Sequence, residues 1–377
     1  MTQTKVEAPF IENNNPFRNL IINGDMQIAQ RSTSTTGVAN NSDEGYNSLD
    51  RFALQYYGNE GGAATMSQDT TVPSDTSFGV RKKSLKVDVT TADTSIGATG
   101  IITLEYIIEA SDVHHSGWDY TSSSSNATLS FWARSVKAGV YGVNFKCYDA
   151  SGGEQRFCRT YTLVANTWQH VVMTVPGDST LVFNDDNGQG LGIRWILAAG
   201  DDRNDATAGS WYAAGSAYEN TTSDQVNFYD STDNNFFLTG VQFEVGDLAS
   251  VFEALPHAVQ LQRCQRYFYR TPDGGDSGTS STYQHLGMGY MHASNNFIGH
   301  LVFSEVMRAA PTCTFAGEVQ VLDSSGARDP GSNISFEQPT SRSVQPQMTI
   351  SGATAGHGAA FRLHNDADGY IQADAEL

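Results

Sequence analysis

Aromatic residues in three polar loops are the residues of this sequence best suited to bind a ligand. The flat face of a Trp or Tyr ring can stack on a sugar ring, while nearby Asn or Asp side chains bond its hydroxyl groups. Asp119, Asn220 and Asp230 are polar neighbours of this kind. The alternative is that the rings plug the ends of a β-sandwich or fill contacts between chains. The predicted carbohydrate-binding residues are Trp118, Tyr120, Trp211, Tyr212, Tyr218 and Tyr229.

Histidines and clustered acidic residues offer only fragments of metal sites. Asp112, His114 and His115 are close in sequence, but adjacent side chains of an extended segment point to opposite sides. The acidic segments 184–190 and 200–205 lack the full spacing of an EF-hand loop and its terminal Glu. We therefore predict solvated loops and turns at all three places.

The cysteines are too few and too scattered for a disulfide framework. Cys147 and Cys158 flank the turn 151–153. Matching the apolar faces of the two flanking strands requires a three-residue loop, and that loop turns Cys158 away from Cys147. We predict free thiols, as expected of a protein made in the cytoplasm. The other cysteines are Cys264 and Cys313.

No catalytic motif is present in the sequence. GxSxG, P-loop and HExxH patterns are absent. Glycan cleavage needs two carboxylates across a groove, but 41 Asp and Glu residues always permit some pair, so their number decides nothing. We predict that the protein is not an enzyme and that it requires no cofactor.

The composition argues against two classes of partner. Of the 377 residues, 39% are hydrophobic and only 17% are charged, yet the net charge is −19. Such an acidic surface repels phosphate backbones, so no nucleic-acid partner is expected. No run of about 18 apolar residues occurs, so we expect no membrane insertion. The first residues also lack the apolar core of a signal peptide.

Alternating apolar and polar residues predict an all-β jelly-roll sandwich over residues 19–253. Leu129, Phe131 and Ala133, for example, share one face of a strand. Among the tryptophans of this region, Trp132, Trp168 and Trp195 are on predicted strands and are expected in the core. The clearest strands are 84–91, 101–108, 127–136, 139–148, 155–164, 168–176, 193–200 and 236–246.

Three further segments complete the predicted organisation. Residues 1–18 are an extended polar arm, in which Phe10, Ile11 and Phe17 supply apolar side chains for docking to a partner. Residues 254–270 form a linking helix, with Pro256 in its first turn and Arg residues near its end. Residues 271–377 form a small C-terminal β domain with Gly, Asn and Pro between its strands.

The stretch NLIINGDMQIAQRS, residues 19–32, resembles the first strand of carbohydrate-binding, galactose-binding-like jelly-roll modules. FFLTGVQFEVG, residues 236–246, resembles their closing strand, and the two would lie side by side. In this view Asn23-Gly24-Asp25 is a bulge within a strand. The resemblance also implies a possible structural calcium, for which Asp25 and Glu244 are the candidate ligands. Thr239-Gly240 stand near the place where such modules carry an Asp.

A second resemblance involves the order of several short motifs. Segment 19–32, LDRF at 49–52, 243–253, 261–270 and VFSEVMRAAPTCTF at 302–315 together resemble bacteriophage tail-fibre and virion-appendage proteins. This implies a virion protein, assembled in the host cytoplasm and usually a homotrimer, that attaches the particle to host surface polysaccharide by multivalent binding. Other virion proteins would hold the arm.

Three alternatives remain open at this stage. The chain could be a capsid decoration, head-fibre or tail-adaptor protein without a glycan site, and its loop aromatics would then be buried against neighbouring chains. It could be a glycan depolymerase, in which case it would release reducing ends. The absence of a visible export signal makes a cellular sugar-binding protein the weakest of the three.

Overall fold

The chain divides into two compact units, one ending at Gln260 and the other comprising Leu261–Glu376. The structure is a computed structural model. It describes residues 17–41, 44–58, 60–74, 83–150, 153–214, 220–271, 283–330, 333–364 and 369–377. The predicted arm, apart from its last two residues, thus lies outside the described residues.

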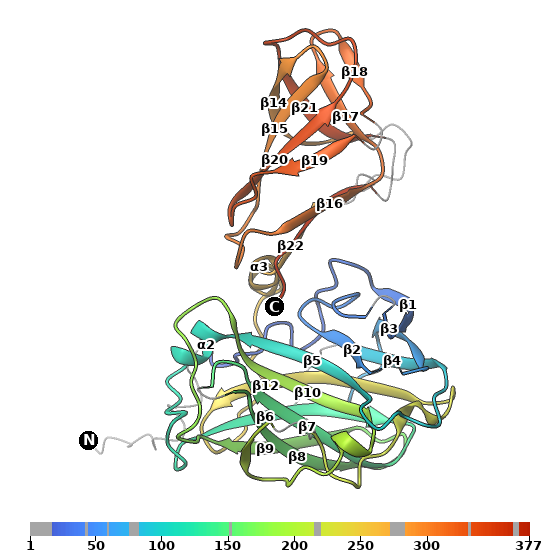
Figure 1. Cartoon of the computed structure of the whole chain (residues 1–377), viewed down its shortest axis with the longest axis vertical. Coiled ribbons are helices and arrows are strands. Elements are labelled where there is room, and N and C mark those ends of the chain that lie inside the picture. The colour runs from blue at the N-terminus through green and yellow to red at the C-terminus, as the bar shows by residue number, and fades with distance from the viewer. Residues whose placement is uncertain are drawn as a thin grey trace, which may run out of the picture. The chain divides into compact units, whose positions relative to one another are not determined.

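The first unit is a jelly-roll sandwich of two antiparallel sheets, as predicted (Figure 1). The chain crosses repeatedly between the sheets, and most hydrogen-bonded neighbours, such as β12 and β6 or β10 and β5, are not consecutive strands. Sheet A has the order β1 (Ser34–Ala39), β3 (Ala63–Asp69), β4 (Ser84–Thr91), β12 (Asn235–Val245), β6 (Asn126–Ser135), β9 (Gln169–Pro176). Sheet B has the order β11 (Trp211–Ala213), β8 (Gln155–Leu163), β7 (Gly139–Cys147), β10 (Gln189–Ala199), β5 (Ile101–Glu109), β2 (Ala53–Tyr57).

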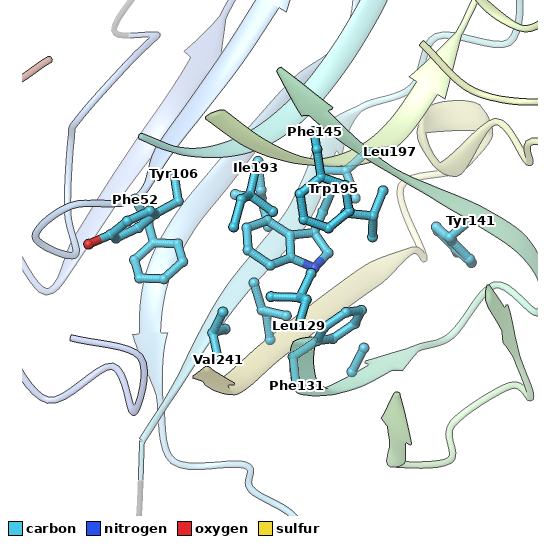
Figure 2. Packing of buried hydrophobic residues seen from close by; sticks show 14 of the residues in the cluster. Phe52, Tyr106, Leu129, Phe131, Tyr141, Phe145, Ile193, Trp195, Leu197 and Val241 are labelled. Atoms are coloured by element: carbon cyan, nitrogen blue, oxygen red, sulfur yellow. The ribbon is translucent and has the colours of Figure 1, made fainter. Parts of the chain in front are cut away.

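Inward-facing side chains of the two sheets form one continuous core. Leu129, Phe131 and Ala133 of β6 are fully buried, which confirms the predicted apolar face. Trp195 of β10 is also fully buried, and its ring centroid lies 5.7 Å from that of Phe131. Figure 2 shows this indole surrounded by side chains from both sheets. The alternation of the sequence therefore sets which face of each strand is buried.

The eight predicted strands of this unit are all present, and most have boundaries within one residue of those expected. β10 begins four residues earlier than expected, at Gln189. Among the described residues, β1, β2, β3 and β11 were not predicted. These are short or polar, as in STTGVA of β1, so their alternation is weak.

The opening segment 19–32 lies beside β12 as predicted, but it is not a strand. The Leu20 backbone N–H donates to the Phe243 carbonyl at 2.9 Å. Asn23 has a φ of 61°, and its amide side chain bonds both backbone groups of Ile28 at 2.8 Å. Because Asn tolerates the left-handed conformation and mimics a turn, this residue folds the segment into a compact loop instead of a bulged strand.

Gly24 in this loop allows close contact with β12. A Cβ atom there would lie 2.1 Å from the carbonyl oxygen of Val241, whose N–H donates to the Gly24 carbonyl. We expect Gly24→Ala to lower the free energy of unfolding by about 1–3 kcal/mol, since the backbones must separate. Urea unfolding checks this, with Gly61→Ala as the control because its Cβ would meet only ordinary contact at 3.6 Å. Equal effects of the two substitutions would contradict the close approach.

The linking helix is shorter than the predicted 254–270. Helix α3 spans His257–Gln265, and a strand, β13 (Phe268–Arg270), follows within the predicted range. β13 pairs with β22, with Phe268 opposite Asp374. Phe268, which lies within the predicted helix, is instead a fully buried strand residue. Strand pairing with a distant segment thus overrides the local helical pattern.

The second unit is all-β, as predicted for the C-terminal domain. Met291, Phe297 and Phe361 lie in its core, and the two Phe ring centroids are 5.9 Å apart. One sheet has the order β13, β22 (Tyr370–Asp374), β16 (Thr312–Ala316). The other has the order β18 (Gly326–Arg328), β17 (Val319–Asp323), β21 (Gly358–His364), β14 (Tyr283–Ala293), β15 (Asn296–Val302), β20 (Ser343–Thr349), β19 (Ile334–Glu337).

The remaining helical segments are short and belong to the first unit. They are α2 (Ala110–His114) and the 3-10 helices η2 (Asp201–Arg203) and η3 (Phe228–Asp230). No helix among the described residues has the length and apolar character needed to cross a membrane.

Candidate functional site

Two of the predicted sugar-stacking residues are buried, which corrects the prediction for them. Trp118 is 3% exposed, and its indole N–H donates to the Ser125 carbonyl at 3.2 Å. Tyr229 is fully buried, and its hydroxyl bonds that of Tyr56 at 2.8 Å. Neither ring has a face free for a ligand. Both close gaps in the sandwich, as the alternative interpretation of the loop aromatics expected.

The other predicted aromatics lie in different surroundings. Tyr120 packs its ring edge-on against Phe183 at 4.9 Å, and Trp211 donates from its indole N–H to the Pro176 carbonyl at 2.7 Å. Both are partly buried against the core. Tyr218 lies outside the described residues. Tyr212 accepts a long hydrogen bond of 3.4 Å from the Asn144 amide on the outer side of sheet B.

Glu244, one of the two predicted calcium ligands, already has hydrogen-bond and ion-pair partners. The Glu244 carboxylate accepts hydrogen bonds from Gln242 and Ser250, and the Arg18 guanidinium lies 3.4 Å from it. A guanidinium and several N–H and O–H donors already meet the oxygens that calcium would need, so Glu244 does not fit that role. Asp25 is 5% exposed. Within the described residues, no three acidic, His or Cys side chains gather as metal ligands.

The two histidines and the cysteines have structural surroundings. His114 and His115 lie at the end of α2, not on an extended segment, and His115 pairs with Asp185 at 2.8 Å. The cysteines are free, as predicted. Cys147 faces the core, whereas Cys158 lies opposite Asn144 on the other face of sheet B. The connection between their strands, 148–154, is longer than the three residues predicted.

The described end of the predicted arm contacts the sandwich itself. Phe17 is 58% exposed, while its backbone N–H donates to the Glu253 carboxylate at 2.5 Å. Arg18 donates to the Ser250 hydroxyl at 2.7 Å. The other two docking residues, Phe10 and Ile11, lie outside the described residues. Docking by the arm therefore stays a prediction.

A row of polar side chains crosses the outer face of sheet B. The strand register places Arg194 of β10 between Glu105 of β5 and Asn144 of β7. Val143 and Phe145, which flank Asn144 in sequence, face the core, so the residues of this row point outward. Because each is fixed on a paired strand, the row is rigid.

Arg194 of this row, with side chains of neighbouring strands and loops, lines an open pocket, here called the sheet B pocket. Its volume is about 210 Å³. Drug-sized ligands occupy pockets of about 300–1,000 Å³, so this one suits a smaller molecule. The residues lining it are Tyr57, Ile101, Lys146, Glu154, Arg156, Arg194, Arg203 and Asn220.

Glu105 organises the inner side of the pocket. Its carboxylate accepts from the Arg194 Nε at 2.8 Å, the Tyr148 hydroxyl at 2.9 Å and the Tyr57 hydroxyl at 3.0 Å. Burial alone would raise its pKa, but the charge of Arg194 and these three hydrogen bonds hold the pKa of Glu105 below its usual range. The Arg194–Glu105 ion pair is therefore charged at neutral pH and fixes both side chains.

Glu154 joins two cations at the other side of the pocket. The Lys146 Nζ lies 2.6 Å from its carboxylate, and the Arg156 Nε donates to it, also at 2.6 Å. Arg156 further donates to the Asn220 side-chain oxygen at 2.8 Å. Burial and the neighbouring charge of Arg194 lower the pKa of Lys146, although Glu154 opposes this. The described lining of the pocket thus combines hydrogen-bond donors, one aromatic ring and several cationic side chains.

Most residues of this pocket were not predicted from the sequence, and the residues that were named lie at its border. The predicted Tyr212 lies opposite Arg156 in the register of β11 and β8, so it belongs to the same region. Asn220, which lines the pocket, was named only as a polar neighbour of the loop aromatics. The cations come from three strands and η2, so no short motif unites them. One signal was present: Lys146, Arg156 and Arg194 occupy polar positions of strands in a chain poor in cations.

A second set of side chains missed by sequence reasoning lies on the outer face of sheet A. Trp132 and Trp168, predicted in the core, are only partly buried there. The Trp132 ring lies 5.0 Å from that of His170 at an interplanar angle of 31°, and Trp168 lies 6.0 Å from Phe237. Strand alternation placed Leu129 and Phe131 inward, so Trp132 must face outward. Trp195 is in the core, as predicted.

No protein-family model matches the sequence, and no curated protein sequence matches it. Among solved structures, the chain is similar to the enzymatically active domain of tailspike protein 4 of bacteriophage CBA120. The identity is 12% and the TM-score is 0.32, over 62% of this chain and 22% of the tailspike chain. This chain therefore spans about a fifth of that protein.

Two carbohydrate-binding modules are also similar in structure. A family 11 module from Clostridium thermocellum, in complex with a β-1,3-1,4-mixed-linked tetrasaccharide, has 9% identity and a TM-score of 0.28, over 58% of this chain and 98% of the module. The CBM22-1 xylan-binding domain from Paenibacillus barcinonensis has 11% identity and a TM-score of 0.27, over 52% and 87%. The assignment of the sandwich fold rests on the strand order and register given above.

Proposed function

We propose that this protein is a carbohydrate-binding protein and that the sheet B pocket holds one residue of a glycan. The observation that carries the proposal is the convergence of Tyr57, Arg156, Arg194 and Asn220 on one small pocket. Hydrogen-bond donors fixed on paired strands lose little entropy when they meet hydroxyl groups, so weak contacts become specific. Multivalent display would add the contacts of several chains.

The finer part of the proposal is a virion appendage that attaches a particle to host surface polysaccharide. Its support is the resemblance of segments 19–32, 243–253 and 302–315 to phage fibres. A homotrimer belongs to the same proposal. Cryo-electron microscopy of the particle tests it: the chain should occupy a peripheral position, with the sheet B pocket turned outward. A pocket covered by other capsid or tail proteins would instead favour a structural component without a glycan site.

The proposal is for binding without catalysis. General acid catalysis of glycan cleavage needs a carboxyl group whose pKa is raised. Among the described residues, the carboxylates bonded to the cations of the pocket are Glu105 and Glu154, and both have their pKa lowered: burial opposes this, but their cationic partners outweigh burial. We expect no release of reducing ends when the protein is incubated with a polysaccharide that it binds. Their release would overturn the non-enzymatic proposal.

A glycan-binding assay on the whole chain tests the site. We expect Tyr57→Ala to weaken binding about tenfold, because the Tyr57 ring forms one wall of the pocket. A tenfold change corresponds to about 1.4 kcal/mol of binding free energy. The matched control is Tyr120→Ala, which removes a partly buried tyrosine that packs on Phe183 away from the pocket. Circular dichroism verifies folding of both variants.

The outcomes of this assay separate two places for the site. Weakened binding in Tyr57→Ala together with unchanged binding in Tyr120→Ala supports the sheet B pocket. Unchanged binding in Tyr57→Ala together with weakened binding in Tyr120→Ala would instead place the site at the loop of Trp118 and Tyr120, as predicted from the sequence. A glycan array on which the wild-type protein binds nothing would overturn the proposed function.

A further inference from the structure

One face of the seven-stranded sheet in the second unit packs on the core of that unit. Met291 of β14, Phe297 of β15 and Phe361 of β21 point to this side. Gly289 makes room for the rings, since a Cβ atom there would lie 2.6 Å from the Phe297 ring. Because successive side chains of a strand point to opposite faces, the residues between these point outward. This outward side is here called the open face, and its central residues are Met288, Tyr290, Ile298, His300 and Val302.

Large apolar side chains are exposed on the open face. Met288 is 68% exposed, Val302 is 59% and Tyr290 is 47%. Strand pairing places Met288 opposite His300 and Tyr290 opposite Ile298, so these side chains form one patch. Of the four large apolar residues that are exposed among the described residues of this unit, three lie on this face. Single exposed apolar side chains are ordinary, but a contiguous patch indicates an interaction surface.

The central strands of the open face contain no carboxylates. The strands β21, β14, β15 and β20 are neighbours in the sheet, and their sequences include neither Asp nor Glu. In the first unit, by contrast, Glu105 lies on the outer face of sheet B and Asp88 on that of sheet A. The chain as a whole has 41 Asp and Glu residues against 22 Lys and Arg residues. The open face is therefore a carboxylate-free apolar patch on a strongly acidic protein.

Contact between copies of an acidic chain requires a patch of this kind. In a symmetric oligomer, a residue near the symmetry axis meets the same residue of another copy. A carboxylate at such a place would face another carboxylate, and like charges across an interface oppose association. A different partner protein sets no such limit, because it can supply Lys or Arg opposite the carboxylates. The composition of the open face therefore favours another copy of this chain as its occupant.

The size of the open face suits an interface between copies. Strands lie about 4.8 Å apart and rise about 3.3 Å per residue, so seven strands of 3 to 11 residues cover roughly 700 Å². Stable complexes bury about 800 Å² on each partner. Side chains of two facing sheets interdigitate across about 10 Å. An unbranched, flexible side chain such as that of Met288 adapts readily to such a contact.

We infer that the open face is covered by the same face of another copy of this chain. The inference goes beyond the proposed function, because the open face belongs to the second unit and the sheet B pocket to the first. A dimer would turn two such faces toward its axis, and the proposed homotrimer would turn three. Association through this face would also join several glycan pockets in one assembly, as multivalent binding requires.

Sedimentation velocity of the whole chain tests the inference. We expect the wild type to form a dimer or trimer whose fraction rises with concentration. Met288→Glu and Val302→Glu each place a carboxylate on the open face, so we expect each to raise the dissociation constant at least about 100-fold. The matched control is Val164→Glu, because Val164 is 58% exposed but follows β8 in the first unit. Thermal unfolding verifies that all three variants fold.

Several outcomes would overturn the inference. A wild-type chain that is monomeric at every concentration would do so, and so would an oligomer that Met288→Glu and Val302→Glu leave intact. Dissociation by Val164→Glu to the same extent would show that added charge alone explains the effect. A monomeric wild type whose glycan binding is lost in Met288→Glu would assign the open face to a glycan instead. The sheet B pocket is tested separately by Tyr57→Ala, so either hypothesis can fail without the other.

Discussion

Replacing Trp195 by Ala is expected to lower the free energy of unfolding of the first unit by about 3–5 kcal/mol. The indole is fully buried between the two sheets, and Figure 2 shows it packed among side chains that include Phe52 and Phe131. Its ring centroid lies 6.3 Å from that of Phe52 and 5.7 Å from that of Phe131. Removing it leaves a cavity that strands fixed by their hydrogen-bond ladders cannot close. Urea unfolding followed by far-UV circular dichroism measures the change.

Two control substitutions separate the cavity from other effects. Trp195→Phe retains most of the volume, and the indole N–H has no hydrogen-bond partner among the described residues. We therefore expect a smaller loss, about 1–2 kcal/mol. Trp132→Ala, on the outer face of sheet A, should cost less than Trp195→Ala because its ring is already partly exposed. A Trp195→Ala protein within 1 kcal/mol of the wild type, roughly the cost of an average substitution, would contradict the core described here.

Replacing Arg194 by Met is expected to have a comparable effect, about 3–5 kcal/mol at pH 7. The substitution leaves the Glu105 carboxylate, 2% exposed, without its ion-pair partner. The cost is therefore mainly that of an uncompensated buried charge. The double variant Arg194→Met, Glu105→Gln removes both charges and should recover part of the loss.

The stability difference between the wild type and the Arg194→Met variant should depend on pH in a defined direction. In the wild type the pKa of Glu105 is lowered, so its contribution to stability is present above about pH 4.3, the ordinary value, and is lost as the pH falls through the lowered value. Without Arg194, burial should raise that pKa, so protonation of Glu105 would stabilise the variant as the pH falls. The stability difference between wild type and variant should shrink from pH 7 to pH 4.5. A difference that grows over this interval would show that Glu105 does not carry the effect.

The sequence predicted the strands of the sandwich better than its loops. Strands such as 84–91 have strong alternation, and their core faces followed directly from it. Residues 19–32 failed as a strand because the Asn23 amide replaces strand pairing with its own hydrogen bonds to Ile28 and Asp50. Residues 268–270 failed as a helix because their partner strand, β22, lies about 100 residues further along the chain. Local patterns of apolar and polar residues reveal neither the hydrogen bonds of a single side chain nor the pairing of a segment with a distant strand.

The candidate site was less predictable for a related reason. Loop aromatics were named because they are conspicuous in sequence, yet Trp118 and Tyr229 close the sandwich. The sheet B pocket depends on register: Arg194 meets Glu105 because β10 pairs with β5 across 89 residues of sequence. Only the pairing of strands brings such residues together. In such folds, Lys and Arg residues at the outward positions of strands in an acidic chain are the sequence signal that indicates a candidate site.

The long separation of paired segments also bears on how the chain acquires its structure during synthesis. Phe17 and Asn19 bond Glu253 across 236 and 234 residues, and Asn19 bonds Phe243 across 224. These contacts cannot form until nearly 260 residues have left the ribosome. Such non-local topology slows folding, because loop closure must precede the contacts that reward it. Sheet A stays in two parts until β12, which joins β4 to β6, has been made, so part of the apolar surface of the sandwich remains uncovered until then. This interval is the one in which aggregation and help from chaperones matter most.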